Sequence, residues 1–137
     1  MKNNFIFFLV IMFCIALPLV GCGSAIHLTN APSVPGAAGE VKLGKDDNNN
    51  TTIEILVQHL AKPEQLAPKK SIYVVWIEAY EQKPVNAGQL MVDDDLEGKF
   101  TAQTPYQYFR IFITAENVPT VSEPGVEVVL STDLLRP

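Results

Sequence analysis

Short stretches of this chain alternate apolar and polar residues, and other stretches are apolar at nearly every position. In Thr52–Gln58 the residues Ile53, Ile55 and Val57 share one face of an extended chain, which is the pattern of a strand with one buried face. Ile72–Ala79 is apolar on both faces and rich in β-branched and aromatic residues, which favours a central strand over a helix. The pattern therefore predicts a β-protein built around Ile72–Ala79.

Seven such stretches are separated by turns rich in Asp, Asn, Pro and Gly, and none has the period of an amphipathic helix. The predicted strands are Glu40–Leu43, Thr52–Gln58, Ile72–Ala79, Gly88–Val92, Lys99–Ala102, Tyr108–Ala115 and Val126–Leu130. Their number and spacing predict an all-β fold, an antiparallel two-sheet β-sandwich of Ig-like kind, with Trp76 packed between the sheets. A closed barrel fits less well because the predicted strands are too few.

The first residues follow a different pattern. Lys2 precedes the apolar run Phe5–Leu17, which is shorter than the ~20 residues that a helix needs to cross the hydrocarbon of a bilayer. A charged start, a short apolar centre and small residues at the exit are typical of a secretory signal peptide. We therefore predict that residues 1–21 are a signal peptide.

The end of this segment, Leu19–Cys22, resembles the lipobox of bacterial lipoproteins. The resemblance implies cleavage between Gly21 and Cys22, a diacylglycerol thioether on Cys22 and a fatty acyl chain, such as palmitate, on its new amino group. Gly23 stands where Gram-negative lipoproteins retained in the inner membrane carry Asp, so the resemblance implies the outer membrane if the cell has one. The alternative is a retained membrane helix over Phe5–Val20.

The remaining chain divides into a tether and one domain. Residues 22–38 contain Pro, Gly and Ser without a regular period, and we predict that they form a lipid-anchored flexible tether whose ends lie about 20–25 Å apart. Residues 39–137 are enough for one modest domain and too few for two.

Composition narrows the function. The chain has a net charge of −5, and loss of Lys2 with the signal peptide makes it more acidic, which argues against nucleic acid as a partner. Cys14 is lost with the signal peptide and Cys22 is acylated, so we expect no disulfide, cysteine nucleophile or thiolate metal site. No nucleophile motif, phosphate loop or zinc helix is present, and we predict a non-catalytic protein without a cofactor.

An ordered set of residues in the second half of the chain resembles the extracytoplasmic C-terminal domain of anti-sigma-K factors and a group of small bacterial lipoproteins. The set comprises Tyr73–Ile77, Pro84, Ala87–Leu90, Phe109–Glu116, Pro124–Gly125 and Val129–Leu130. The resemblance implies an exported β-sandwich that senses or binds. The sigma-binding domain and the membrane helix of those factors have no counterpart here, so we expect no sigma inhibition.

One acidic segment is a weak candidate for a metal site. Asp93, Asp95 and Glu97, followed by Gly98, resemble the first half of an EF-hand calcium loop. The position that supplies a bidentate Glu in such a loop is Thr104, so the motif is incomplete. The preferred interpretation is an acidic turn, and a Ca²⁺ site is the alternative.

Three further residues are of types that can bind a ligand. Tyr106 and Tyr108 alternate and could form an aromatic platform for a sugar or peptide, although aromatic residues are ordinary in a β-sandwich core. His59 falls in phase with Ile53 and is expected to be half-buried at a strand end. We expect a lipid-anchored module that docks an unidentified cell-envelope protein through loops or an edge strand. The alternative is a carbohydrate- or small-ligand-binding lipoprotein.

Overall fold

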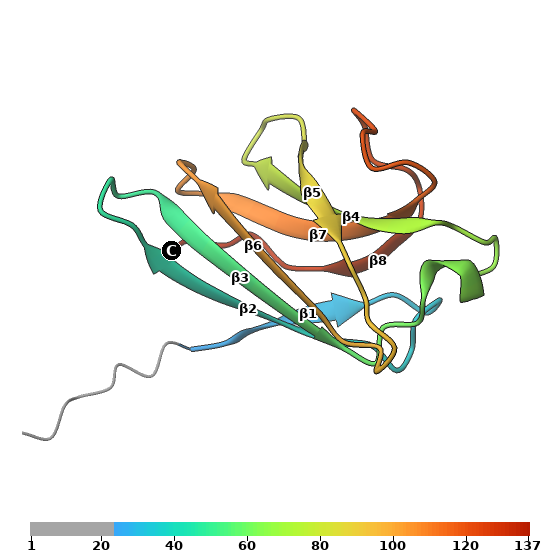
Figure 1. The fold of residues 1–137 in the computed structure, drawn as a ribbon. Helices are drawn as coiled ribbons and strands as arrows, with labels where there is room; N and C mark the ends of the chain where they lie inside the picture. The colour runs from blue at the N-terminus through green and yellow to red at the C-terminus, as the bar shows by residue number, and fades with distance from the viewer. Residues whose placement is uncertain (1–23) are drawn as a thin grey trace, which may run out of the picture.

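The computed structural model describes residues 24–137, so the predicted signal peptide, its cleavage site and the lipidation of Cys22 lie outside the described part (Figure 1). The described residues form eight strands and one short 3-10 helix. The strands are β1 (Ile26–Asn30), β2 (Ala38–Lys45), β3 (Thr51–Gln58), β4 (Ile72–Ala79), β5 (Val85–Leu90), β6 (Gly98–Thr104), β7 (Phe109–Glu116) and β8 (Val128–Ser131), and the 3-10 helix η1 is Pro63–Gln65. Over residues 24–137, no helix has the length and apolar character needed to cross a membrane.

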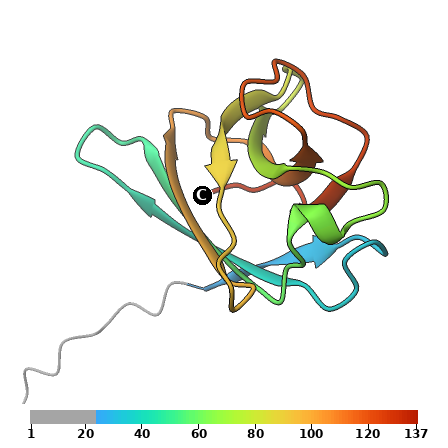
Figure 2. The same ribbon diagram turned by 45° about the vertical axis from the view of Figure 1, so that its right-hand side comes forward.

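All eight strands belong to one antiparallel sheet with the order β5-β4-β7-β8-β1-β2-β3-β6. The sheet bends back on itself, so that β1, β2, β3 and β6 face β4, β5, β7 and β8 (Figures 1 and 2). β1 joins the two halves, because Ile26–Leu28 pair with β2 whereas Thr29 and Asn30 pair with β8. The end strands β5 and β6 approach each other near the isolated bridge between Val92 and Gly98, which leaves the sheet nearly closed.

The structure confirms an all-β antiparallel fold and corrects its arrangement. The division into two sheets of about seven strands is wrong, because eight strands form one nearly closed sheet. The additional strand is β1, which lies inside the segment 22–38 that the sequence predicted to be a flexible tether. Leu28 is the one buried residue of the five in β1, so the alternation of apolar and polar residues there is too short to identify a strand from the sequence. An Ig-like relationship stays a prediction.

The main core lies between the two halves of the sheet. β3 contributes Ile53, Ile55 and Val57 from one face, as the alternation predicted, and these side chains are almost fully buried. β4 contributes Tyr73 and Val75. The Tyr73 hydroxyl donates a hydrogen bond to the carbonyl of Ala61 (2.6 Å), and burial raises the pKa of Tyr73 above its usual range.

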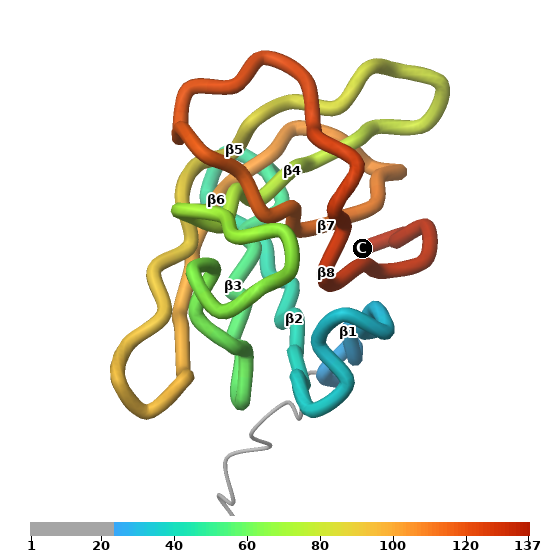
Figure 3. The backbone as a smooth tube through the Cα atoms, turned by 90° about the vertical axis from the view of Figure 1, so that its right-hand side faces the viewer, coloured from blue at the N-terminus to red at the C-terminus, as the bar shows by residue number. Residues whose placement is uncertain are grey.

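Trp76 lies on the opposite face of β4 from this core, which corrects its predicted position between the sheets. It is fully buried in a second cluster with Val74 and Phe112, and Val121 of the β7–β8 connection packs against that cluster. The rings of Trp76 and Phe112 stack with centroids 6.2 Å apart. The β7–β8 connection crosses the upper part of the domain near β4 (Figure 3). A long loop therefore covers apolar residues on the outer face of the sheet.

Hydrogen bonds hold the β7–β8 loop against the sheet. The Trp76 indole N–H donates to Thr114 Oγ1 (2.8 Å), and the Thr114 hydroxyl donates to the carboxylate of Glu116 (2.7 Å). The same carboxylate accepts the backbone N–H of Gly125 (2.7 Å). From β5, the Asn86 amide donates to two carbonyls of the loop, at 2.9 Å each. Each of these buried polar groups therefore has a hydrogen-bond partner.

Candidate functional site

The end of the β4–β7 pair carries charged and aromatic side chains that are exposed and do not belong to the core. Glu78 of β4 lies opposite Arg110 of β7, and the two side chains form a hydrogen-bonded ion pair. Two pairs further along, the backbone N–H of Tyr80 donates to the carbonyl of Tyr108 (3.0 Å). Their neighbours Ala79 and Phe109 are buried, so Tyr80 and Tyr108 occupy the outward positions of the alternation. Tyr80 is 62% exposed and Tyr108 is 53% exposed.

The C-terminal segment extends this surface beyond β7. Leu135 forms an isolated antiparallel bridge with Phe109, in which its N–H donates to the Phe109 carbonyl (2.7 Å) and its carbonyl accepts from the Phe109 N–H (3.3 Å). Leu135 is buried, so its neighbours Leu134 and Arg136 take the outward positions. The Arg136 guanidinium lies over the Tyr108 ring, 5.4 Å from its centroid, in a cation–π contact.

We name this surface the Tyr–Arg face. It comprises Glu78, Tyr80, Tyr108, Arg110, Leu134 and Arg136.

Charged and aromatic side chains lie next to each other on the Tyr–Arg face. The Arg110 guanidinium lies 5.4 Å from the centroid of Phe112 and is paired with Glu78, whereas no carboxylate of residues 24–137 lies within ion-pair distance of Arg136. The acidic chain has two arginines, Arg110 and Arg136, and both lie on the Tyr–Arg face. Tyr and Arg are enriched among the residues that contribute most to binding at interfaces. The face can stack on a planar or sugar ring and can bind a carboxylate through Arg136.

The structure places the predicted pair Tyr106 and Tyr108 in different surroundings. Tyr106 is half-buried and packs against the main core, whereas Tyr108 is exposed beside Tyr80 and Arg136. Sequence reasoning missed Tyr80, although it continues the alternation of β4 beyond Glu78. The pairing of β4 with β7, which brings Tyr80 to Tyr108, was the information that the sequence lacked.

The acidic segment is the connection between β5 and β6. Asp93 Oδ1 accepts the backbone N–H groups of Asp95 (3.0 Å) and Glu97 (2.9 Å), so its carboxylate caps the turn from within. Leu96 has a φ of 62°, in the left-handed region, which lets the turn close. Within residues 24–137 no group of three His, Cys, Asp or Glu side chains is arranged to hold a metal ion. The geometry is that of a capped turn.

The β2–β3 turn has the same construction, which the sequence did not reveal. Asp46 Oδ1 accepts the N–H groups of Asn48 and Asn50 at 2.8 Å each, and Asn49 has a φ of 62°. Hydrogen bonds from the Asn50 side chain and backbone hold the pKa of Asp46 below its usual value. Both acidic turns therefore use one aspartate as a structural cap.

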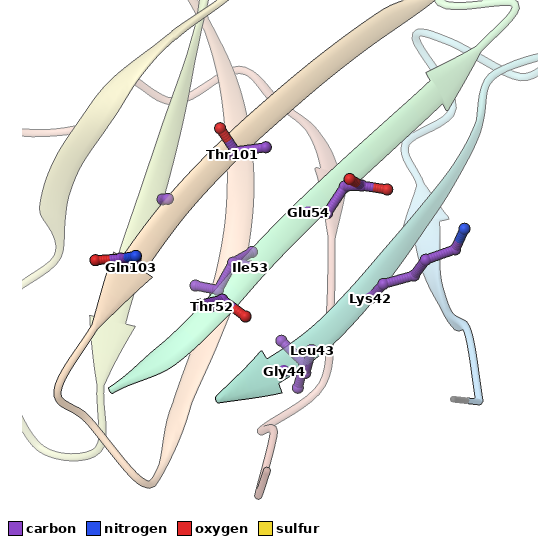
Figure 4. Close-up of a pocket in the computed structure, with 9 residues that line it drawn as sticks. Lys42, Leu43, Gly44, Thr52, Ile53, Glu54, Thr101 and Gln103 are labelled. Carbon is purple, nitrogen blue, oxygen red and sulfur yellow. The ribbon is translucent and has the colours of Figure 1, made fainter. Parts of the chain in front are cut away.

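A shallow hollow of about 620 Å³ lies on the outer face of β2, β3 and β6 (Figure 4). Lys42, Glu54 and Thr101 form one cross-strand row of its lining. The Lys99 ammonium lies 2.9 Å from the Glu54 carboxylate, and this hydrogen bond holds the pKa of Glu54 below its usual value. The lining mixes polar and apolar side chains of the sheet, and none of its residues is aromatic, in contrast to the Tyr–Arg face.

His59 is exposed, which corrects the expectation that it is half-buried. Its φ is 55°, so the chain leaves β3 through the left-handed region and the alternation ends before this residue.

Comparison of the chain with protein-family models, with curated proteins and with solved structures finds no match. The resemblance to the anti-sigma-K domain stays a prediction.

Proposed function

We propose that this chain is a lipid-anchored, non-catalytic protein of the cell envelope that docks another envelope protein through the Tyr–Arg face. The observation that carries the docking part is the gathering of Tyr80, Tyr108 and Arg136 on one exposed surface of an acidic chain. The anchor would be a diacylglycerol thioether on Cys22, in the outer membrane if the cell is Gram-negative.

The chemistry of the face supports a protein partner. Tyrosine supplies a large contact area with few rotatable bonds, so little conformational entropy is lost when a partner covers it. Arg136 already lies against Tyr108, so its guanidinium is partly ordered and can donate two hydrogen bonds to a carboxylate in a bidentate geometry. Paired Arg110 and Glu78 add a polar rim beside this centre.

Crosslinking of the full chain in its native envelope tests this proposal. We expect one envelope protein to be crosslinked by the parent chain, and its yield to fall at least fivefold in Tyr108→Ala and Arg136→Gln. Met91→Ala is the matched control, because Met91 is 73% exposed but lies outside the Tyr–Arg face. Equal yields in parent, control and both variants would contradict docking at this face.

The anchor is tested separately by intact mass. We expect the exported chain to begin at Cys22 with a mass increased by diacylglycerol and one acyl chain, and Cys22→Ser to abolish the increase. An exported product with an unmodified cysteine would refute the lipid anchor without affecting the docking result.

A second candidate function is carbohydrate or small-ligand binding, and the exposed Tyr80 beside Tyr108 is the observation that favours it. Adjacent rings could stack on successive sugar units, with Arg136 on an acidic group. A glycan array probed with the purified full chain in detergent distinguishes the two functions. A hit that is lost in both Tyr80→Ala and Tyr108→Ala would favour the carbohydrate ligand over the protein partner.

A further inference from the structure

The two ends of the sheet differ in how they are protected against pairing with another strand. β5 has a register shift where it pairs with Val75 and Trp76, and Pro84 comes directly before it. β6 pairs with β3 over all seven of its residues without a shift and contains no proline. An edge strand presents unpaired backbone N–H and C=O groups, and proteins usually protect such edges with charges, prolines or bulges.

The protection of β6 is weak. Its one charged residue is Lys99, and the ammonium of Lys99 is already paired with Glu54 of the same sheet at 2.9 Å. Thr101 and Gln103, which share the outer face with Lys99, are exposed and uncharged. Gly98, at the start of β6, is already bridged to Val92, so the regular edge on which a further strand can add runs from Lys99 to Gln103.

The inner face of β6 lacks part of its cover. Phe100 and Ala102 lie opposite Ile55 and Ile53 of β3, which are 0% and 2% exposed. Phe100 and Ala102 themselves are only half-buried, although both pack against the main core. Because β3 has a neighbouring strand on each side and β6 beyond Gly98 has only β3, a strand added beside β6 would cover these two apolar residues.

We propose that β6 pairs antiparallel with β6 of a second copy of this chain, about a two-fold axis at Thr101. The sequence of β6 is self-complementary in this register. Thr101 lies opposite Thr101 of the second copy, Lys99 opposite its Gln103, and Phe100 opposite its Ala102. No like charges face each other, a large apolar residue faces a small one, and each contact occurs twice, as in an isologous dimer.

The symmetry of this pairing is compatible with a shared membrane. The two-fold axis of an antiparallel strand pair is perpendicular to the sheet, so both chains enter their domains on the same side of the extended sheet. The pairing uses neither Cys22 nor the Tyr–Arg face, so it does not depend on the proposed function.

Cysteine crosslinking of the full chain in membranes tests both the dimer and its register. In Thr101→Cys the two thiols lie directly opposite across the axis, where Cα atoms of paired strands are about 4.5–5.5 Å apart, within the range of a disulfide. We expect mild oxidation to convert most of this variant to a covalent dimer. The unsubstituted chain measures the background from its own cysteines.

Single variants on either side of the axis are the matched controls. Lys99→Cys alone and Gln103→Cys alone place like residues four positions apart along the paired strands, about 13 Å, too far to bridge. We expect neither to crosslink alone, and a mixture of the two to form a disulfide-linked dimer. Tyr108→Ala added to Thr101→Cys should leave the yield unchanged, which separates this proposal from docking at the Tyr–Arg face.

A charge at the axis provides a second, non-covalent test. Thr101→Lys opposes two lysines in the dimer, whereas in one copy the new lysine lies across from Glu54 and leaves the fold intact. We expect its dimer dissociation constant in detergent to rise about fivefold, and an equal mixture with Thr101→Glu to restore the affinity. A Thr101→Cys yield no higher than that of Gln103→Cys would overturn the proposal. A crosslinked product whose mass is not twice that of the chain would also overturn it and would assign the edge to a different protein.

Discussion

The hydroxyl of Thr114 lies at the centre of the hydrogen bonds that hold the β7–β8 loop over Trp76, and its removal gives a quantitative prediction. Thr114→Val preserves the shape and the β-propensity of the side chain. It leaves the Trp76 N–H without an acceptor and the Glu116 carboxylate with one donor in place of two. Thr114 is 0% exposed and Glu116 is 7% exposed, so water cannot replace the lost partner fully.

The magnitude follows from these two losses. A buried donor left without a partner costs about 1–3 kcal/mol, and a lost hydrogen bond to a carboxylate about 1.5–3 kcal/mol. Because the loop can move slightly to admit water, we expect Thr114→Val to lower the free energy of unfolding by about 2–4 kcal/mol. For a domain of this size the melting temperature would fall by roughly 8–16 °C.

Urea unfolding followed by tryptophan fluorescence measures the effect directly, because Trp76 is the only tryptophan of the chain. Thr29→Val is the control, since Thr29 is exposed on β1 and we expect a change within 0.5 kcal/mol there. If Thr114→Val unfolds at the same urea concentration as Thr29→Val, the loop is not held by this network, and the burial of Trp76 depends on apolar packing alone.

Three further predictions concern the turns and the closure of the sheet. Gly98→Ala should lower stability by about 1–3 kcal/mol in thermal melts, because a Cβ there would lie 2.7 Å from the Met91 carbonyl oxygen, whereas Gly36→Ala, with no atom within 4 Å, should be neutral. Asp46→Ala should lower the melting temperature at pH 7, and the difference from the parent should vanish as the pH falls below about 4. The pKa of Asp46 is lower in the folded than in the unfolded chain, so its carboxylate stabilises the fold fully only above the unfolded-state pKa. This stabilisation is lost as the pH falls through the folded-state pKa. Asp93→Ala should lower the melting temperature equally with calcium or with a chelator, since Asp93 caps a turn; a shift with calcium in the parent alone would support the metal site instead.

The strands that the sequence predicted best are those with a long and unambiguous pattern. β3 was found because its alternation matches burial on one face, and β4 and β7 because β-branched and aromatic residues dominate them. β1 was missed because it supplies one buried residue, Leu28, among partly or fully exposed neighbours, and its pairing with β8 joins residues far apart in the sequence. Local pattern therefore predicts strands more securely than the strand order that closes the sheet.

The errors at individual side chains have the same origin. Trp76 belongs to a strand that is apolar on both faces, so alternation alone cannot show which face meets the main core. Its actual side is set by the β7–β8 loop, whose Val121 covers it. Tyr80 was missed because a turn position has no predicted neighbours, and the bridge between Leu135 and Phe109 that brings Arg136 to Tyr108 joins residues far apart in the chain. A site formed by residues of different strands therefore cannot be predicted from the sequence until the pairing register of those strands is known.

The early start of β1 changes how the proposed anchor would hold the domain. Three residues, Gly23–Ala25, separate Cys22 from β1, and they span at most about 10 Å, which is about half of the tether length that the sequence predicted. A lipid on Cys22 would therefore keep the domain close to the bilayer. In Figures 1, 2 and 3 the start of β1 lies in the lower part of the domain and the β4–β5 turn, which begins at Tyr80, lies at the top. The Tyr80 end therefore lies across the domain from the proposed anchor, where a partner can reach it.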